Sequence, residues 1–322
     1  MNIIRGIAAI PQGLIRPVVT IGNFDGVHLG HQELLNRVIK RAIDINGTSV
    51  VITFDPHPVK VLRPEKAPRL LISLQEKIEL FQSFGIKVTI CIDFTPEFAG
   101  WSPDEFVDDV LHKKIGTKVI IVGANYKFGK GQAGNIDYLR NKGKTLGFEV
   151  EVVDSIQIGG NRVSSSRIRE HLIKGEVDKA AGLLGRYYDI DGIVTPGHHR
   201  GMELGYPTAN IYTVDEAIPK AGIYAVKVMR GYENIDGVCY IGTQPTFAGD
   251  RIGVEVYLFN FNGTLYHEHL RIQFVKMIRE EMKFDSKEEL IRHIRDDVEK
   301  AEEALTEIKN QTTHFVGTPK SK

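Results

Sequence analysis

The sequence predicts a parallel α/β domain followed by an antiparallel β-barrel domain with a C-terminal helix. From Val18 to about Leu184, strand-like runs alternate with helical patterns, which is the order of elements that builds a parallel sheet. After Arg186, short strand-like runs follow one another with Gly, Pro and Asn turns, and helical patterns are missing until Ser286. With 322 residues the chain is long enough for two cores. The expected parts are domains at 1–184 and 185–306 and a polar tail at 307–322.

The elements of the first domain follow from hydrophobic periodicity. Val18-Val19-Thr20-Ile21 is an apolar β-branched run typical of a buried strand, and Leu34, Leu35 and Val38 recur at helical spacing after it. Similar runs predict strands over 50–54, 88–92 and 119–122, and similar spacing predicts helices over 31–45, 74–84, 103–112 and from Ser164 through Leu172.

The second domain shows strand-like runs at regular intervals. We expect strands over 188–194, 222–229, 238–241, 254–261 and 270–275, and an amphipathic helix over about 286–305. Strands this short and this closely spaced favour a barrel over a parallel sheet, because parallel strands need long crossover connections.

Composition points to a globular protein that acts on small molecules. Charged residues make up 25% of the chain, and 41 Lys and Arg balance 41 Asp and Glu, so no overall field attracts nucleic acid or a membrane surface. Cys91 and Cys239 lie far apart and form no metal or redox motif, which fits core positions in a reducing cytoplasm. No apolar run reaches membrane-spanning length, so we expect a soluble cytoplasmic protein, and nothing in the sequence indicates an oligomer.

The most informative segment is Gly22-Asn23-Phe24-Asp25-Gly26-Val27-His28-Leu29-Gly30-His31, which joins a predicted strand to a predicted helix. Its glycines let a phosphate approach backbone N–H groups, and the start of a helix favours an anion. His28 and His31 are three residues apart, so both imidazoles lie on one face of the first turn and can donate to phosphate oxygens. We interpret the segment as a nucleotide-phosphate site, although a purely structural turn has the same pattern.

A second basic segment, Ser164-Ser165-Ser166-Arg167-Ile168-Arg169, opens a predicted helix. The serines can cap that helix, while Arg167 and Arg169 offer positive charge for phosphate oxygens. Taken alone, the segment favours a structural cap.

Two other phosphate-like motifs lack the required context. Residues 129–134 match G-x-G-x-x-G, but they do not follow the first strand directly, as a dinucleotide site requires. Gly143-Lys144-Thr145 resembles the end of a P-loop, but Tyr138 stands where its first glycine belongs. We therefore exclude both as nucleotide motifs.

In the second domain, Thr208 and Asn210 stand two residues apart after a glycine-containing loop. In an extended segment they share a face and offer oxygen ligands of the kind that Mg²⁺ takes, although composition alone favours a turn. His267 and His269 also stand two apart, but no third ligand is evident, so we expect them to be surface residues.

Several motifs together resemble a known family, the prokaryotic bifunctional riboflavin kinases/FAD synthetases. The first-domain motifs are Gly22–His31, Thr53-Phe54-Asp55-Pro56-His57-Pro58, residues 123–129 and residues 164–169. The second-domain motifs are Pro207-Thr208-Ala209-Asn210, residues 242–247, residues 254–258 and residues 274–279. The resemblance covers about Val18 to Ala304. It implies a Rossmann-like nucleotidyltransferase domain followed by a riboflavin-kinase-type barrel.

For the first domain, the resemblance implies that FMN attacks the α-phosphorus of ATP to give FAD and pyrophosphate. His28 and His31 would act on the ATP phosphates and stabilise the charge that develops there. The implied ATP site is Gly22, Asn23, Phe24, His28, His31, Ser164, Ser165, Arg167 and Arg169. The implied flavin site is Phe54, Asp55, His57, Asn125 and Phe128, where His57 between two prolines has the alternative of a rigid loop residue.

For the second domain, the resemblance implies that riboflavin is phosphorylated to FMN. Glu255 would accept the proton of the ribityl 5′-hydroxyl, and Arg279 would contact the flavin. Thr208 and Asn210 would hold Mg²⁺ and ATP, together with Gly197, Arg200, Gly201 and Gly205. The chain departs from the family pattern at the histidine-rich loop around His199 and at Tyr240, where an Asn is common. Both departures are expected on the ATP side of the kinase, where they affect its efficiency and leave the reacting groups in place.

Two other functions fit parts of the sequence. One is a different adenylyl- or cytidylyltransferase with an unrelated barrel, against which Thr208, Asn210 and Glu255 argue. The other is a flavin-binding regulator without ATP turnover. Incubation with riboflavin, ATP and Mg²⁺ distinguishes them by the products.

Overall fold

The computed structural model describes residues 1–196, 204–213, 216–246 and 249–315, and the chain divides into two compact units. The first unit is Met1–Ser165 and the second begins at Ser166. Each unit is described by itself below.

The first unit holds a parallel sheet of six strands in the order β1-β4-β3-β2-β5-β6. The strands are β1 (Asn2–Arg5), β2 (Val18–Ile21), β3 (Ser49–Asp55), β4 (Val88–Asp93), β5 (Val119–Gly123) and β6 (Glu149–Val153). The helices are α1 (Leu29–Asp44), α2 (Pro58–Leu62), α3 (Leu74–Phe84), α4 (Pro96–Ala99), α5 (Pro103–Glu105), the π-helix η3 (Phe106–Lys114) and α6 (Ile136–Leu146). Short 3-10 helices cover Ile7–Ala9, Pro64–Lys66 and Lys130–Gln132, and β7 (Gln157–Ile158) pairs with β8 (Asn161–Arg162).

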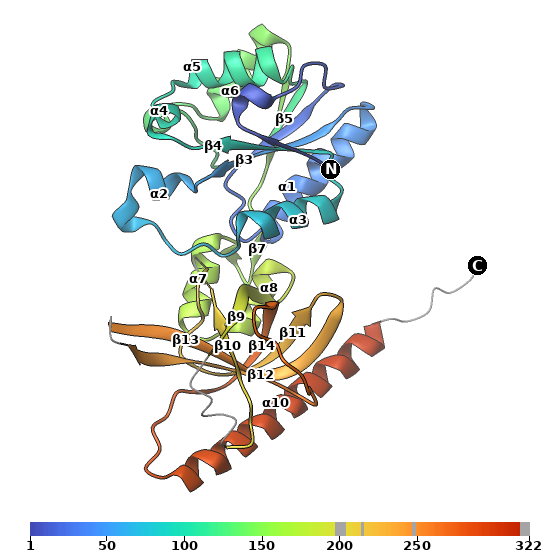
Figure 1. Ribbon diagram of the computed structural model, residues 1–322. Coiled ribbons are helices and arrows are strands. Elements are labelled where there is room, and N and C mark those ends of the chain that lie inside the picture. The colour runs from blue at the N-terminus through green and yellow to red at the C-terminus, as the bar shows by residue number, and fades with distance from the viewer. Residues whose placement is uncertain (197–203, 214–215, 247–248, 316–322) are drawn as a thin grey trace, which may run out of the picture. The chain divides into compact units, whose positions relative to one another are not determined.

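The central strands are buried on both faces, which explains their uninterrupted apolar runs. One core joins Val19 and Ile120 of the sheet to η3 and α6. The other joins Val18 and Val51 to α1 and α3. Figure 1 shows the sheet with α5 and α6 on one side and α1 and α3 on the other.

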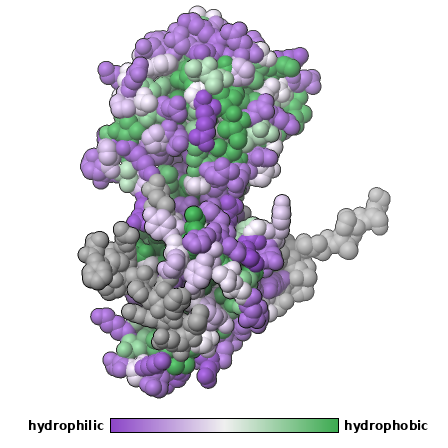
Figure 2. Space-filling model, in the orientation of Figure 1, coloured by the Kyte–Doolittle hydropathy of each residue, from purple (hydrophilic) through white to green (hydrophobic). Residues whose placement is uncertain are grey.

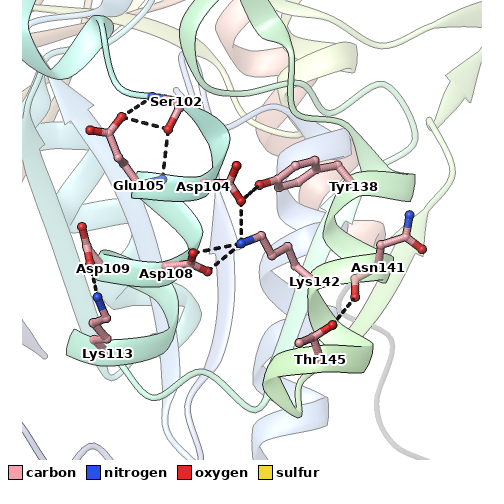
Figure 3. A network of polar contacts seen from close by, with 10 residues as sticks. All are labelled: Ser102, Asp104, Glu105, Asp108, Asp109, Lys113, Tyr138, Asn141, Lys142 and Thr145. Carbon is pink, nitrogen blue, oxygen red and sulfur yellow. Dashed lines mark hydrogen bonds and ion pairs between the residues drawn. The ribbon is translucent and has the colours of Figure 1, made fainter.

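A polar network ties η3 to α6 at the surface (Figure 3). Lys142 of α6 donates to Asp104 at 2.5 Å and to Asp108 at 2.9 Å, and the Tyr138 hydroxyl donates to Asp104. A capping box between Ser102 and Glu105 stabilises the start of α5, which leads directly into η3. Because these groups are largely exposed, each ion pair contributes about 1 kcal/mol or less to the folding free energy.

The second unit is a closed antiparallel barrel with strand order β10-β13-β12-β11-β14-β9. The strands are β9 (Tyr188–Thr195), β10 (Ala209–Tyr212), β11 (Gly222–Arg230), β12 (Glu233–Thr246), β13 (Gly249–Leu258) and β14 (His269–Glu280). Helices α7 (Ser165–Ile173) and α8 (Val177–Leu184) precede the barrel and α10 (Lys287–Phe315) follows it. Ala301, Ala304 and Leu305 of α10 pack on Ile223 and Val238 of the barrel, and Figure 1 shows the helix running along it.

The fold class is confirmed, with differences in single elements. The predicted strands and helices of both domains are present. Elements that were not predicted include the strands β1, β6, β7, β8 and β10 and the helices α2, α4, α6 and α8. Helix α10 remains helical to Phe315, so the expected tail from residue 307 is not a loop at its start. His267 precedes β14 and His269 begins it, and both are exposed, as expected.

The boundary between the domains stays a prediction. The chain was expected to divide near 183–188, whereas the compact units divide at Ser165 and Ser166. Helices α7 and α8 therefore belong to the barrel unit, because α8 packs against β9 and β14.

The positions of the cysteines, the surface and the hydrophobicity of the helices can be compared with the expectations from composition. Cys91 and Cys239 are free thiols that fill core positions, as expected. The face of the molecule seen in Figure 2 carries hydrophilic residues with hydrophobic areas among them. Within the described ranges, none of the helices combines the length and the hydrophobicity that crossing a membrane requires.

Candidate functional sites

The Gly22–His31 segment lies where the order of the parallel sheet reverses. The chain passes from β2 to β3 on one side, and β5 is added later on the other side of β2. Ligands of open α/β sheets bind at this point, at the carboxyl ends of the strands. Asp55 ends β3 and Gly123 ends β5, so the motifs at residues 22–31, 53–58 and 123–129 all lie at the carboxyl ends of the neighbouring strands β2, β3 and β5.

The turn after β2 has an unusual backbone that is held by other elements. Phe24 and Val27 have φ values of 49° and 39°, which residues with a side chain seldom adopt, and Gly26 has 82°. Buried Asp25 accepts the Leu71 amide at 2.9 Å through its side chain. Its carbonyl accepts the Ser165 hydroxyl at 2.8 Å. Strained backbone fixed in this manner is typical of a ligand-binding turn.

His28 and His31 form a stacked pair at the start of α1. Their ring centroids are 3.6 Å apart and their planes differ by 13°. Nδ1 of His28 accepts the His31 amide at 3.3 Å and so caps the helix. In the neutral ring this leaves the proton on Nε2, so His28 keeps one N–H donor for a ligand. Phe24 contacts His31 at 5.2 Å between ring centroids and itself packs on Phe81 of α3.

Both imidazoles are neutral at neutral pH. Burial lowers the pKa of His28 to about 4. Burial also lowers the pKa of His31 well below its ordinary value, and the charges of His28, Lys77 and Arg162 add to this effect. Neighbouring cations together with the positive end of a 16-residue helix make the site attractive to a polyanion.

Sequence reasoning missed Lys77 and Arg162. Lys77 is 5% exposed on α3, and burial lowers its pKa. Arg162 belongs to the short strand β8. Lys77 stands four residues before Phe81 and so falls on the same buried face of a predicted helix, which is a signal that the sequence alone offers. No such sequence pattern distinguishes Arg162.

The other predicted ATP residues have mixed surroundings. The Gly22 amide donates to the Ile52 carbonyl, the Asn23 carbonyl accepts the Thr53 hydroxyl at 3.4 Å, and Phe24 is buried in the core. Ser164 precedes α7 and Ser165 begins it. Arg167 and Arg169 follow on α7 in the second unit, and their place in an ATP site remains a prediction.

The predicted flavin residues of the first unit are partly joined by aromatic contacts. Phe54 contacts Phe98 at 6.1 Å, Phe98 contacts Phe106, and Phe106 contacts Phe128 at 5.8 Å. His57 caps α2 through the Val59 amide. Asp55 and Asn125 are exposed.

The two phosphate-like motifs that the sequence analysis excluded form a loop and part of a helix in this unit. Residues 129–134 form a loop closed by hydrogen bonds between Phe128 and Gly134, and Gly143–Thr145 lie inside α6. A cavity of about 650 Å³ borders α6, with Asp108 and Lys142 in its wall. It lies on the face of the sheet opposite to α1. It is therefore not the site of the paired imidazoles.

In the second unit, the predicted kinase residues meet across β10 and β13. The Thr208 hydroxyl donates to Oε2 of Glu255 at 3.0 Å. Asn210 stands directly opposite Glu255 in the strand register, so their side chains share a face. Composition favoured a turn here, but Asn210 lies in a strand because β9 and β13 both pair with it. A cavity of about 190 Å³ adjoins Thr208, with Phe261, Leu265 and Tyr266 in its wall.

Arg279 has a firm partner in α10. Its guanidinium donates to both carboxylate oxygens of buried Asp297, at 2.8 and 2.7 Å, and lies over the Phe284 ring. Gly205 is exposed with a φ of 84°. Gly197, Arg200 and Gly201, with neighbouring His199, lie outside the described residues.

These two sites define a two-unit enzyme class. The α/β unit carries a stacked histidine pair at a helix N-terminus and at the switch point of its sheet, where anionic ligands bind, and the barrel carries a separate carboxylate, hydroxyl and amide cluster. The FAD synthetase family model matches residues 11–167, and the riboflavin kinase family model matches residues 184–305.

Relatives and a solved structure agree over nearly the whole chain. The bifunctional riboflavin kinase/FMN adenylyltransferase of Buchnera aphidicola subsp. Schizaphis graminum is 38% identical, over 93% of this chain and 97% of its own. The enzyme of the same name from Escherichia coli K12 is 36% identical, over 90% and 93%. A crystal structure described as a macrolide-efflux protein from Streptococcus pneumoniae is 30% identical with a TM-score of 0.85, over 92% of this chain and 97% of that chain. The chain belongs to the family of bifunctional riboflavin kinases/FMN adenylyltransferases, which confirms the resemblance seen in the sequence.

Proposed function

We propose that this chain makes FMN from riboflavin and ATP in the barrel unit, and FAD from FMN and ATP in the α/β unit. The observation that carries the proposal is the presence of two separate donor sets in one chain, His28 with His31 and Thr208 with Asn210 and Glu255. Family membership supports both reactions.

In the adenylyl transfer, a phosphate oxygen of FMN attacks the α-phosphorus of ATP. The bond from that phosphorus to the bridging oxygen breaks, and pyrophosphate leaves with the electron pair. The protein needs no covalent nucleophile for this step, because positioning and stabilisation of phosphate charge are enough. The neutral imidazoles of His28 and His31 supply N–H donors at a helix N-terminus, and Lys77 and Arg162 supply positive charge nearby.

The remaining predicted residues complete this first site in our proposal. Gly22, Asn23 and Phe24 shape the turn, while Ser164, Ser165, Arg167 and Arg169 complete the ATP site. Phe54, Asp55, His57, Asn125 and Phe128 hold the flavin. The aromatic contacts from Phe54 to Phe128 support a flat ring system at this edge of the sheet.

In the kinase reaction, Glu255 accepts the proton of the ribityl 5′-hydroxyl. The hydroxyl oxygen then attacks the γ-phosphorus of ATP, and ADP leaves as the bond to the bridging oxygen breaks. The contact with Thr208 fixes the Glu255 carboxylate beside the strand that carries Asn210. Gly197, Arg200, Gly201 and Gly205 belong to the ATP side and Arg279 to the flavin side of this proposal.

The same cluster fits Mg²⁺. Thr208 uses its proton to reach Glu255, so its oxygen lone pairs can still serve a cation, and Asn210 adds an amide oxygen on the same face. When bound there with ATP, the ion would neutralise phosphate charge. A cytoplasmic location, with small molecules rather than nucleic acid or a membrane as partners, is part of the proposal.

The test separates riboflavin, FMN and FAD by chromatography after incubation with ATP and Mg²⁺. Wild type yields FMN and then FAD from riboflavin, and a chelator stops FMN formation. His31→Ala abolishes FAD formation from supplied FMN and spares FMN formation from riboflavin, because the imidazole donor belongs to the first unit. Glu255→Gln has the reverse effect, because it removes the base but not the acceptor for Thr208.

Matched controls are His112→Ala and Glu233→Gln, since both residues are exposed and lie outside the two sites. They are expected to leave both reactions unchanged. Equal loss of both reactions in either site variant would contradict separate sites, and a wild type that makes neither product would refute the proposal.

A further inference from the structure

One cross-strand row on the barrel connects the residues of the kinase site. Asn210 of β10 pairs with Glu255 of β13, and Glu255 pairs with Tyr240 of β12. Tyr240 pairs with Ile223 of β11, and Ile223 pairs with Arg279 of β14. Directly opposite residues of antiparallel strands share a face, so Tyr240 stands beside Glu255 on the side away from Asn210.

The Tyr240 side chain is fixed by two neighbours. Its hydroxyl donates to Oε1 of Glu281, just past β14, at 2.5 Å. A Cβ at Gly242 would stand 1.9 Å from the Tyr240 hydroxyl oxygen and 2.6 Å from Oε1 of Glu281. The phenol therefore lies across the strand in space that only a glycine leaves open. Burial and Glu281 raise the pKa of Tyr240, so the hydroxyl remains a donor at neutral pH.

The order of groups along the row separates the two substrates. A base that takes the proton of an attacking hydroxyl must lie within hydrogen-bond reach of that hydroxyl, so the acceptor alcohol lies at Glu255. Thr208 and Asn210, on one side of Glu255, belong to the ATP side of the proposed function. Tyr240 and Glu281 stand on the other side, where Arg279 ends the row.

We propose that the Tyr240–Glu281 pair forms the wall of the acceptor site and sets the affinity for riboflavin. This inference rests on the kinase activity proposed above. Tyr240 stands next to Glu255 in the register and packs against the cluster that contains Ile223 and Leu305. Its hydrogen bond to Glu281 holds the start of the β14–α10 connection against β12. Tyr240 acts here as a specificity-determining residue of this chain, at a position where its sequence departs from the family pattern. The strand register thus favours the acceptor side for Tyr240 over the ATP side expected from the sequence.

The experiment measures FMN formation and riboflavin binding in Tyr240→Phe, Glu281→Ala and the double variant. Tyr240→Phe removes the donor and Glu281→Ala removes the acceptor of the same hydrogen bond, so the KM and the Kd for riboflavin rise about tenfold in each. The double variant shows the same rise as either single one, because the contact can be lost only once. The KM for ATP and the conversion of supplied FMN to FAD stay unchanged. Riboflavin fluorescence without ATP gives the Kd independently of turnover.

Tyr224→Phe is the matched control. Tyr224 is next to Ile223 on β11 and therefore on the opposite face of the strand, where its hydroxyl donates to the Lys220 carbonyl. Its loss is expected to leave the riboflavin KM unchanged. An unchanged riboflavin KM and Kd in both single variants would overturn the inference. So would a rise confined to the ATP KM, or effects that multiply in the double variant. A wild type without FMN formation would instead refute the proposed function.

Discussion

At the scale of single residues, His28 combines two tasks in one ring. Nδ1 accepts the His31 amide and caps α1, while Nε2 keeps its proton and can donate to a ligand. The cap therefore fixes the tautomer that the proposed phosphate contact needs. Thr208 also combines two tasks, because its hydroxyl donates its proton to Glu255 while its oxygen lone pairs can coordinate a cation.

The buried imidazoles make the stability of the first unit depend on pH. The pKa of His28 is lowered from 6.5 to about 4, so between these values the unfolded chain binds more protons than the folded one. The contribution of His28 to the free energy of unfolding is therefore largest above pH 6.5 and decreases as the pH drops toward 4. The loss for His28 amounts to roughly 3 kcal/mol. Urea unfolding followed by Trp101, the single tryptophan of the chain, measures it in this unit.

The control is His28→Asn, which keeps a good N-cap and removes the titration. We expect a shallower fall of the unfolding free energy in this variant. Equal slopes for wild type and His28→Asn would show that the His28 ring does not titrate with folding.

At the scale of elements, α10 completes the core of the barrel unit. Leu305 is 1% exposed and packs with Ala301 and Ala304 against the strands. Arg279 and Asp297 join the same helix to β14 by a bidentate ion pair. The helix therefore helps to hold the strand end that carries the proposed flavin side.

Leu305→Ala is expected to destabilise the barrel unit by about 2–5 kcal/mol, because it leaves a cavity in this core. The temperature at which FMN formation is lost then falls. The Trp101 unfolding transition of the α/β unit stays in place. Glu303→Ala, an exposed change on the same helix, should have no such effect. Equal heat sensitivity of Leu305→Ala and wild type would contradict a core role for α10.

At the scale of the whole molecule, the histidine pair and the Thr208–Glu255 cluster lie in different compact units. His28 and His31 lie in the first unit, and Thr208, Asn210 and Glu255 lie in the second. FMN is the product of one and the substrate of the other. We therefore expect that a substitution can stop one reaction without the other, and that mixing two such variants restores the complete sequence of reactions.

A mixture of His31→Ala and Glu255→Gln is expected to make FAD from riboflavin and ATP, which neither variant does alone. The first variant supplies FMN to solution and the second converts it. Chromatography of the flavins at several protein concentrations measures this exchange. A mixture without FAD, from variants that each perform their own half reaction, would mean that FMN passes only within one chain.

Much of this organisation was present in the sequence. The apolar run of β2, the spacing of α1 and α3, and the short strands of the barrel predicted both architectures, because periodicity reports burial directly. The motif around His28 and His31 predicted one site, since a strand, a glycine turn and a helix start form a local unit. The edge strands β1 and β6 were missed because they carry few fully buried residues.

The sequence by itself determined the fold class, the histidine pair and the residue types of the kinase cluster, all of which depend on neighbours along the chain. Only the tertiary structure decided that Asn210 faces Glu255, that Tyr240 lies beside that base, and that Arg279 binds Asp297. Lys77 and Arg162 likewise come close enough to His31 to lower its pKa only through folding. The physical reason is that strand register and burial place residues far apart in sequence within reach of each other's charge.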